Sequence, residues 1–223
     1  MKRFIKSLKL LKYGLQAKTL LILTVFFFVA GVLIELFLAN VGSDIVSGLY
    51  LSISGVYIYQ LMVTPTASSL VQTSSYKYAL QTKYPTIMTM CTTLFTFSIF
   101  VCLRVYRIAN LGGREFSEAT MTTSRGIFVT ALLCGILLTY NGICFKKYIL
   151  SFILLFAVVF LIIATGSFDY LSSALSFTDN FSYSTLIISS YALVVAGGIL
   201  GWLVSILCYR MPIDALSVRS ALR

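Results

Sequence analysis

Long hydrophobic runs separated by short polar stretches make up most of this 223-residue chain. About 20 apolar residues in a helix are enough to cross the ~30 Å hydrocarbon core of a bilayer. Six runs approach or exceed this length, at residues 19–40, 45–66, 86–106, 126–145, 148–166 and 185–208. Only Lys146-Lys147-Tyr148 separates the fourth run from the fifth, so we expect a tight helical hairpin there. The pattern predicts an all-α polytopic membrane protein, with six transmembrane helices in a single transmembrane domain over residues 1–223.

The composition agrees with a membrane protein. Hydrophobic residues form 59% and charged residues 11% of the chain, and the mean hydropathy is +0.95. Soluble domains have about 45–50% apolar and about 25% charged residues. The composition therefore excludes a soluble globular domain, and we expect membrane lipids rather than nucleic acid around this chain.

Residues 1–18 are basic and precede the first apolar run. The opening MKRFIKSLKLLKYG resembles the start of a signal peptide, but the following run is too long and lacks a small-residue cleavage pattern. We expect this segment to be retained as an amphipathic elbow helix that lies on the inner leaflet. Its apolar face carries Phe4, Leu8, Leu11 and Leu15, and its basic face carries Lys2, Lys6 and Lys9. The alternative is a cluster of positive charge that only fixes the orientation.

The distribution of charge predicts the orientation, because cytoplasmic segments carry an excess of Lys and Arg. With the N-terminus inside, the inner segments hold one acid, Asp214, and 13 of the 17 basic residues: Lys2, Arg3, Lys6, Lys9, Lys12, Lys18, Lys77, Lys83, Lys146, Lys147, Arg210, Arg219 and Arg223. The outer segments hold the other six acids: Glu35, Asp44, Glu115, Glu118, Asp169 and Asp179. We therefore expect a multi-pass protein of the cell membrane with both termini in the cytoplasm.

The segment 106–125 departs from this trend. It is expected to be an outer loop, yet the outer segments include four arginines: Arg104, Arg107, Arg114 and Arg125. If only five runs span the membrane, this loop would be cytoplasmic instead.

Residues 67–85 form a polar, weakly basic segment between the second and third runs. The charge distribution places it in the cytoplasm, where Ser74 or Ser75 is suited to cap a short helix from Tyr76 to Lys83. Pro85 follows at the start of the third run, where its missing N–H is tolerated. Tyrosine is enriched at protein interfaces, so this composition favours docking against another protein. The alternative is an ordinary solvated loop.

The elbow helix, the six runs and the polar segment together resemble the membrane subunit of type-2 ATP-binding-cassette (ABC) transporters. The stretch QLMVTPTASSLVQTSSYKYALQTKYPTIMTM is similar to the coupling region of small permeases from Gram-positive bacteria. The outer stretch SFDYLSSALSFTDNFSYS is similar to that family's small re-entrant element. The resemblance covers the whole chain and is architectural.

The resemblance implies a permease subunit, an exporter, that forms the path with a second copy or a paralogue. The residues expected to couple it to cytosolic ATPase subunits are Ser74, Ser75, Tyr76, Lys77, Leu80, Gln81, Lys83 and Tyr84. The chain has no G-x-x-x-x-G-K-[ST] motif, so ATP and Mg would be held by the partner subunits. We expect this chain itself to be no enzyme and to hold no cofactor. The cargo would be a flexible molecule such as a peptide or a lipid-like compound.

Two narrow helix faces predict close packing. Gly197 and Gly201 form a small-xxx-small pair in the last run, and Gly48 and Gly55 form a similar stripe in the second. Packing within the chain and packing against a second subunit explain both faces equally well.

Few residues suggest other chemistry. Glu35, Arg104 and Arg107 lie near the outer ends of their runs, where we expect mutual pairing or snorkelling rather than a proton relay. The chain has no histidine, and its five cysteines form no CxxC pair, so zinc and haem sites are not expected. We expect the cysteines to be small buried hydrophobic residues.

Two other functions remain open. One is the substrate-binding subunit of an energy-coupling-factor importer, with the outer tyrosine-rich stretch over a ligand pocket. The other is a membrane assembly or immunity factor that only binds partners.

Overall fold

The computed structural model describes residues 17–38, 45–67, 69–110, 114–144, 146–147, 149, 151–153, 155–156 and 182–212. Within these residues it contains helices and no strand, which confirms the predicted all-α class. Among the described residues, five helices are long and apolar enough to cross a membrane. The predicted elbow helix lies outside the described residues except for residues 17 and 18, and most of the run 148–166 also lies outside them.

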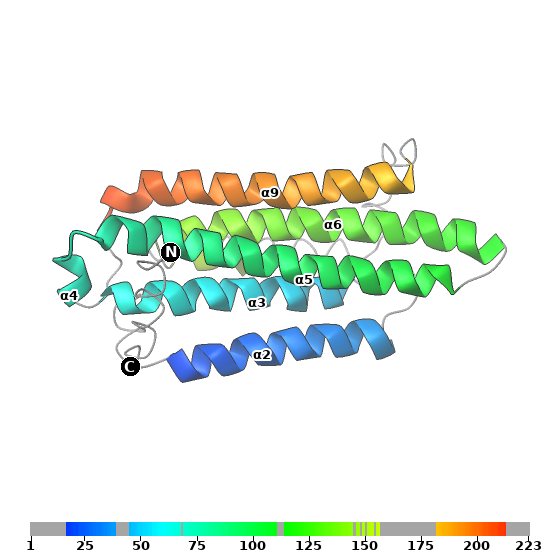
Figure 1. The fold of residues 1–223 in the computed structure, drawn as a ribbon, viewed down its shortest axis with the longest axis horizontal. Coiled ribbons are helices and arrows are strands. Elements are labelled where there is room, and N and C mark those ends of the chain that lie inside the picture. The colour runs from blue at the N-terminus through cyan, green and yellow to red at the C-terminus, as the bar shows by residue number, and fades with distance from the viewer. Residues whose placement is uncertain are drawn as a thin grey trace.

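The long helices lie side by side along one axis (Figure 1). Helix α2 (Ala17–Leu33) ends in a π-helical turn, η2 (Ile34–Leu38), and α3 (Ile45–Val63) continues into η3 (Thr64–Ala67). The short α4 (Ser69–Gln72) precedes a second π-helical turn, η4 (Ala79–Lys83), and α5 (Tyr84–Ala109). Helix α6 (Arg114–Cys144) follows, and α9 (Tyr183–Leu207) ends in η6 (Cys208–Arg210).

Helices α6 and α9 run in the same direction and form the most extensive contact of the bundle. Gly197 lies against Gly135, and Gly201 lies against Leu138 one turn further along both helices. Because the two helices are parallel neighbours, Cys144 at the end of α6 and Ser182 before α9 lie at opposite ends of the bundle.

The segment 106–125 is helical over most of its length and is not a long loop. Helix α5 extends to Ala109 and α6 begins at Arg114, so only residues 110–113 separate two helices. The polar sequence between the apolar runs contains good helix formers such as Glu, Arg, Ala and Met, so both helices continue beyond their apolar parts. Hydropathy identified the spans, but the apolar runs are shorter than the helices: α5 continues past the end of its run and α6 begins before the start of its run.

The polar segment before α5 differs from its prediction in the same way. We predicted a separate helix from Tyr76 to Lys83, but the chain is helical without a break from Lys77 into α5. Pro85 lies in the first turn of α5 and offers no N–H to the carbonyl of Gln81, four residues earlier. The Ser205 hydroxyl of α9 lies 3.5 Å from this carbonyl and donates to it. The π-helical turn and the proline are thus accommodated inside one continuous helix.

An apolar cluster fills the middle of the bundle. Its most buried members come from α3, α5, α6 and α9: Leu51, Phe97, Phe100, Val101, Ile127, Ala131, Cys134, Leu138 and Val194. Many hydroxyl groups around it bond to carbonyls one turn earlier in their own helix. Ser52 donates to Gly48 and Thr89 donates to Pro85, for example. These bonds satisfy the hydroxyls locally inside an apolar bundle.

Candidate functional site at the lysine-bearing end

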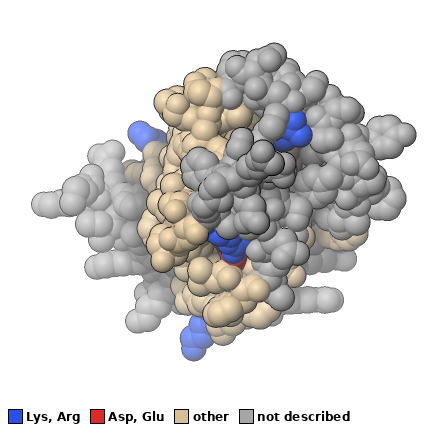
Figure 2. All heavy atoms as spheres, turned by 90° about the vertical axis from the view of Figure 1, so that its right-hand side faces the viewer, with Lys and Arg blue, Asp and Glu red and all other residues tan. Residues whose placement is uncertain are grey.

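The two ends of the bundle carry different charged residues. One end, called here the lysine-bearing end, carries Lys18, Lys77, Lys83, Lys146, Lys147 and Arg210 among the described residues. The opposite, acid-bearing end carries Glu35, Arg104, Arg107 and the first turns of α6 with Glu115 and Glu118. Figure 2 views the acid-bearing end, where basic and acidic side chains meet near the middle of the face. The lysines of the described residues therefore gather at one end only.

The predicted coupling residues lie at the lysine-bearing end. Ser74 lies in the turn that precedes the helix, and its hydroxyl accepts the N–H of Tyr76 at 3.2 Å, so it closes this turn rather than capping the helix itself. Ser75, Tyr76 and Lys83 are exposed, whereas Lys77, Leu80 and Tyr84 are half-buried. Gln81 is buried and faces the bundle instead of solvent. The segment therefore has an outward face of tyrosine and lysine and an inward face that packs on α9.

Tyr78 belongs to this segment and is absent from the predicted set. It is 44% exposed, and its ring packs edge-to-face on Tyr209 with 5.0 Å between centroids. The sequence places Tyr76 and Tyr78 two residues apart, but only the position of η6 shows that Tyr78 meets the end of α9. The outward face thus continues from the segment onto Tyr209.

Lys146 joins three elements beneath this face. Its Nζ donates to the carbonyl of Tyr209 in η6 at 3.4 Å and to that of Met211, directly after η6, at 3.0 Å. It also donates to Gln81 Oε1 at 3.4 Å. Cations are favoured at helix C-termini, where carbonyls lack helical partners. Burial, with a smaller effect from nearby Lys77, lowers the pKa of Lys146.

A small polar cavity lies beside Lys146. Its volume is about 10 Å³, which is near the size needed for one water molecule. It is lined by Tyr59, Val63, Gln81, Thr82, Gly142, Lys146, Ser205 and Tyr209. The Nε2 of Gln81 is buried there and has no hydrogen-bond partner among the described residues. Sequence reasoning missed Tyr59, Lys146 and Ser205, because they come from three different helix ends.

The four predicted packing glycines all lie against helices of the same chain. A side chain at Gly197 would overlap the backbone of Gly135, and one at Gly201 would overlap the carbonyl of Leu138. Gly48 and Gly55 lie against Thr130 and Thr93. The small-residue faces therefore pack within the chain, which agrees with the first of the two explanations.

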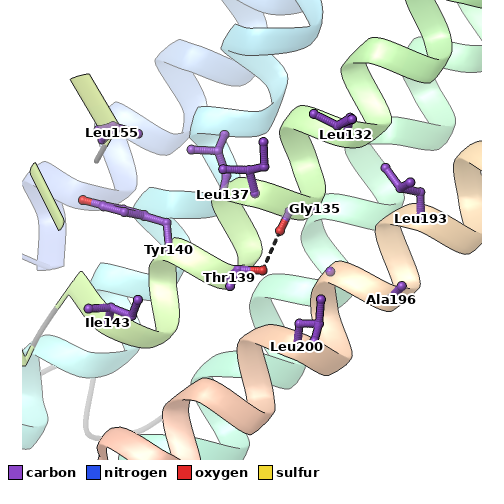
Figure 3. Close-up of a pocket in the computed structure, with 12 residues that line it drawn as sticks. Leu132, Gly135, Leu137, Thr139, Tyr140, Ile143, Leu155, Leu193, Ala196 and Leu200 are labelled. Carbon is purple, nitrogen blue, oxygen red and sulfur yellow. Dashed lines mark hydrogen bonds between the residues drawn. The ribbon is translucent and has the colours of Figure 1, made fainter. Parts of the chain in front are cut away.

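A larger cavity of about 450 Å³ lies between α6, α9 and Leu155 (Figure 3). Its lining is almost wholly apolar, with Leu132, Leu193 and Leu200 among the side chains. The hydroxyl of Thr139 faces the cavity wall but donates to the carbonyl of Gly135 at 2.9 Å. This lining suits an apolar molecule and offers no charged group to a polar one.

The possible metal ligands and thiols lie apart from one another in the part of the chain that the structure describes. No group of three His, Cys, Asp or Glu residues is close enough to hold a metal ion there. The five cysteines are free thiols. Cys134 and Cys144 are buried as predicted, but Cys91 and Cys102 are exposed on α5, so the prediction of burial is wrong for these two.

Comparisons with models of known protein families, with curated proteins and with solved structures found no match. The functional argument therefore rests on the arrangement of this chain's own residues.

Proposed function

We propose that this chain is the permease subunit of a type-2 ABC exporter, paired with a second permease subunit and driven by separate ATPase subunits. The observation that carries the proposal is the segment Ser74–Lys83. It presents Tyr76 and Lys83 outward at the lysine-bearing end and continues without a break into α5. A partner that binds this face would act directly on a helix that runs the length of the bundle.

The directions of the helices support six membrane passes. Because α6 and α9 are parallel, the chain has to return from one end of the bundle to the other between Cys144 and Ser182. The apolar run 148–166 has the length for that pass. The gathering of lysines at one end supports a cytoplasmic position for that end of a cell-membrane protein, with both termini in the cytoplasm.

The contacts of Gln81 and Lys146 supply a route from the segment to α9. Gln81 lies on the continuous helix that begins directly after Tyr76, and it contacts both Ser205 and Lys146. Lys146 in turn binds two carbonyls of the turn that follows α9, those of Tyr209 and Met211. Movement of the segment would therefore displace α5 and α9 together. Transport by alternating access needs such a link between the ATP-driven partner and the helices around the path.

The test is the replacement of Tyr76, which is 48% exposed, by glutamate. The matched control is Tyr106→Glu, because Tyr106 is an exposed tyrosine at the other end of the same helix. Both variants are purified in mild detergent from membranes of the source cell. Co-purifying polypeptides are identified by mass spectrometry, and ATP hydrolysis is measured.

We expect the unchanged chain and Tyr106→Glu to retain a polypeptide with a Walker motif, and Tyr76→Glu to lose it together with the ATP hydrolysis. Retention of that subunit and of its hydrolysis by Tyr76→Glu would refute coupling through this face. A bound small ligand and no ATPase would instead favour the importer subunit. An assembly factor would retain neither.

A further inference from the structure

Four polar side chains from three elements meet inside the acid-bearing end. Glu35 of η2 is fully buried, and its Oε1 lies 2.6 Å from Arg104 Nε and 3.5 Å from Arg107 Nη1. Its Oε2 accepts the hydroxyl of Ser47 at 2.5 Å. Arg107 also donates to the backbone carbonyl of Glu35. The mutual pairing predicted for these charges is therefore confirmed, and Ser47 is an addition that the sequence did not indicate.

The two arginines differ in their surroundings. Arg104 is 2% exposed, and its guanidinium lies 5.1 Å from the centre of the Phe100 ring, an arrangement typical of cation–π contact. Arg107 is 22% exposed and reaches the surface of the end face. Figure 2 shows the basic and acidic atoms together in the middle of that face. Glu35, Ser47 and Arg104 are thus buried, and Arg107 is the member of the cluster that solvent reaches.

This cluster supplies the polar contacts between the end of α2, at η2, and α5. Along its length α2 packs chiefly against α3, and among the described residues its closest approach to α5 is through η2. The opposite face of α2 carries exposed apolar side chains, such as Ile22 and Phe26, with no described helix against them. The position of η2 relative to α5 therefore depends on Glu35 and its partners.

The π-helical turn places Glu35 in the interior. A π-helical turn is wider than an α-helical one and is frequent at functional positions. It lets Glu35 turn toward α5 while the neighbouring Phe37 is 78% exposed. Buried ion pairs add little net stability when intact, yet loss of one partner is strongly unfavourable. Such a contact sets which of two arrangements the helices adopt rather than how tightly they pack.

We propose that Glu35, Ser47, Arg104 and Arg107 form an ionic lock that holds η2 closed against α5, and that its release opens the acid-bearing end of the bundle. The lock has a closed state, seen here, and a second state in which α2 and α5 are separated at this end. The inference does not rest on the proposed transport function, because it concerns only this chain's own helices.

The test measures the separation of η2 and α5 directly. Spin labels are placed on cysteines introduced by Phe37→Cys and Tyr106→Cys, two exposed positions that flank the lock. The native Cys91, Cys102 and Cys208 are replaced by alanine so that no other accessible thiol is labelled. The distance distribution is recorded by pulsed electron paramagnetic resonance on the full chain in lipid nanodiscs.

We expect one short-distance population in the chain with the intact lock. Glu35→Gln keeps the shape of the side chain but removes its charge, so the ratio of separated to closed states should rise about 100-fold. A state near 1% of the molecules would then become about half of them. Lys18→Gln removes one charge at the opposite end and should leave the distances unchanged.

An unchanged distance distribution in folded Glu35→Gln would overturn the lock. If Glu35→Gln does not yield folded protein, Arg107→Gln decides the question, because Arg107 is partly exposed and its loss disturbs the interior less. A longer-distance population in Arg107→Gln supports the lock, and its absence overturns it. Ser47→Ala, which removes a single hydrogen bond, should give a smaller rise than either.

Discussion

At the acid-bearing end, side chains from three elements bind one another in the interior, whereas at the lysine-bearing end one ammonium group binds backbone carbonyls near the surface. Glu35 and Arg104 are both almost completely buried and lie 2.6 Å apart. Lys146 is half-buried, and its contacts to the carbonyls of Met211, directly after η6, and Tyr209, in η6, are 3.0 and 3.4 Å long. The first arrangement fails when any one partner is lost. The second needs only the lysine, because the carbonyls are present whatever the local sequence.

The two ends share one structural device. Each has a π-helical turn, η2 or η4, and each turn carries a polar residue into the interior, Glu35 or Gln81. The carboxylate meets charged partners, while the amide meets Lys146 and a cavity the size of one water molecule. Both ends therefore use a π-helical turn. The turn at the acid-bearing end is held by ion pairs, whereas the turn at the lysine-bearing end makes weaker polar contacts. This difference is consistent with the two proposals above, in which a partner moves the lysine-bearing end and the ionic lock keeps the acid-bearing end closed.

The largest effect is expected for Glu35→Ala. Removal of the carboxylate leaves the buried Arg104 without the anion that faces it, and breaking a buried pair in this way costs about 3–5 kcal/mol. The free energy of unfolding in detergent, followed by helical circular dichroism during titration with a denaturing detergent, measures the loss. Leu36→Ala is the control, since Leu36 is the next residue and is exposed. Equal losses for both would show that the charge has no special role.

The next effect concerns the seam between α6 and α9, which joins the two ends. Gly197→Ala places a methyl group into the backbone of Gly135, and such overpacking costs about 1–3 kcal/mol. Gly198→Ala makes the same change one residue later, where the nearest atoms belong to the flexible Met90 side chain, so it should cost less than about 1 kcal/mol. Thermal unfolding of the two variants in detergent compares them.

A Gly198→Ala variant as unstable as Gly197→Ala would mean that the seam is not the rigid part of the bundle. A large difference between the two would mean that α6 and α9 move as one body. Displacement at the lysine-bearing end would then be carried along α9 toward the acid-bearing end.

The spans could be predicted from sequence better than the site. Hydropathy located the five described spanning helices, because some 20 apolar residues in a row have few alternatives to crossing a bilayer. It failed at their ends, since residues 114–122 are polar and yet helical in α6. Polarity marks where the apolar run stops, whereas backbone hydrogen bonding decides where a helix stops.

The candidate site shows the same division. Ser74 was predicted as a cap from local chemistry, and its contact with Tyr76 needs only neighbouring residues. From sequence, Lys146 indicates only the turn after the fourth run and the orientation of the chain. Its contacts could not be predicted, because its partners Gln81 and Tyr209 lie more than 60 positions away. The glycine pairs were predicted as close-packing faces, but only the register of α6 against α9 shows which helix fills them. Contacts between distant segments need the topology first.

The third effect is smaller and tests the lysine-bearing end. Lys146→Met keeps the aliphatic stem and removes the ammonium group from the carbonyls of Tyr209 and Met211. Because the group is half-buried, we expect a loss of about 1.5 kcal/mol, at the low end for hydrogen bonds to charged groups. Lys147→Met, at the exposed neighbour, should change stability by less than about 0.5 kcal/mol. A loss at Lys146 as large as that at Glu35 would remove the distinction between the two ends.

The smallest effect is a pH dependence of stability that belongs to Lys146. Burial lowers the pKa of Lys146 in the folded chain below the ordinary value of 10.5. Between the lowered pKa and 10.5, the unfolded chain therefore binds more protons than the folded chain, and stability rises with pH. Lys146→Gln lacks this group. The unfolding temperature of the unchanged chain, measured relative to that of Lys146→Gln, should therefore increase as the pH approaches 10.5. Lys147→Gln should show no such divergence, and parallel curves for Lys146→Gln would mean that the ammonium group is solvated like a surface lysine.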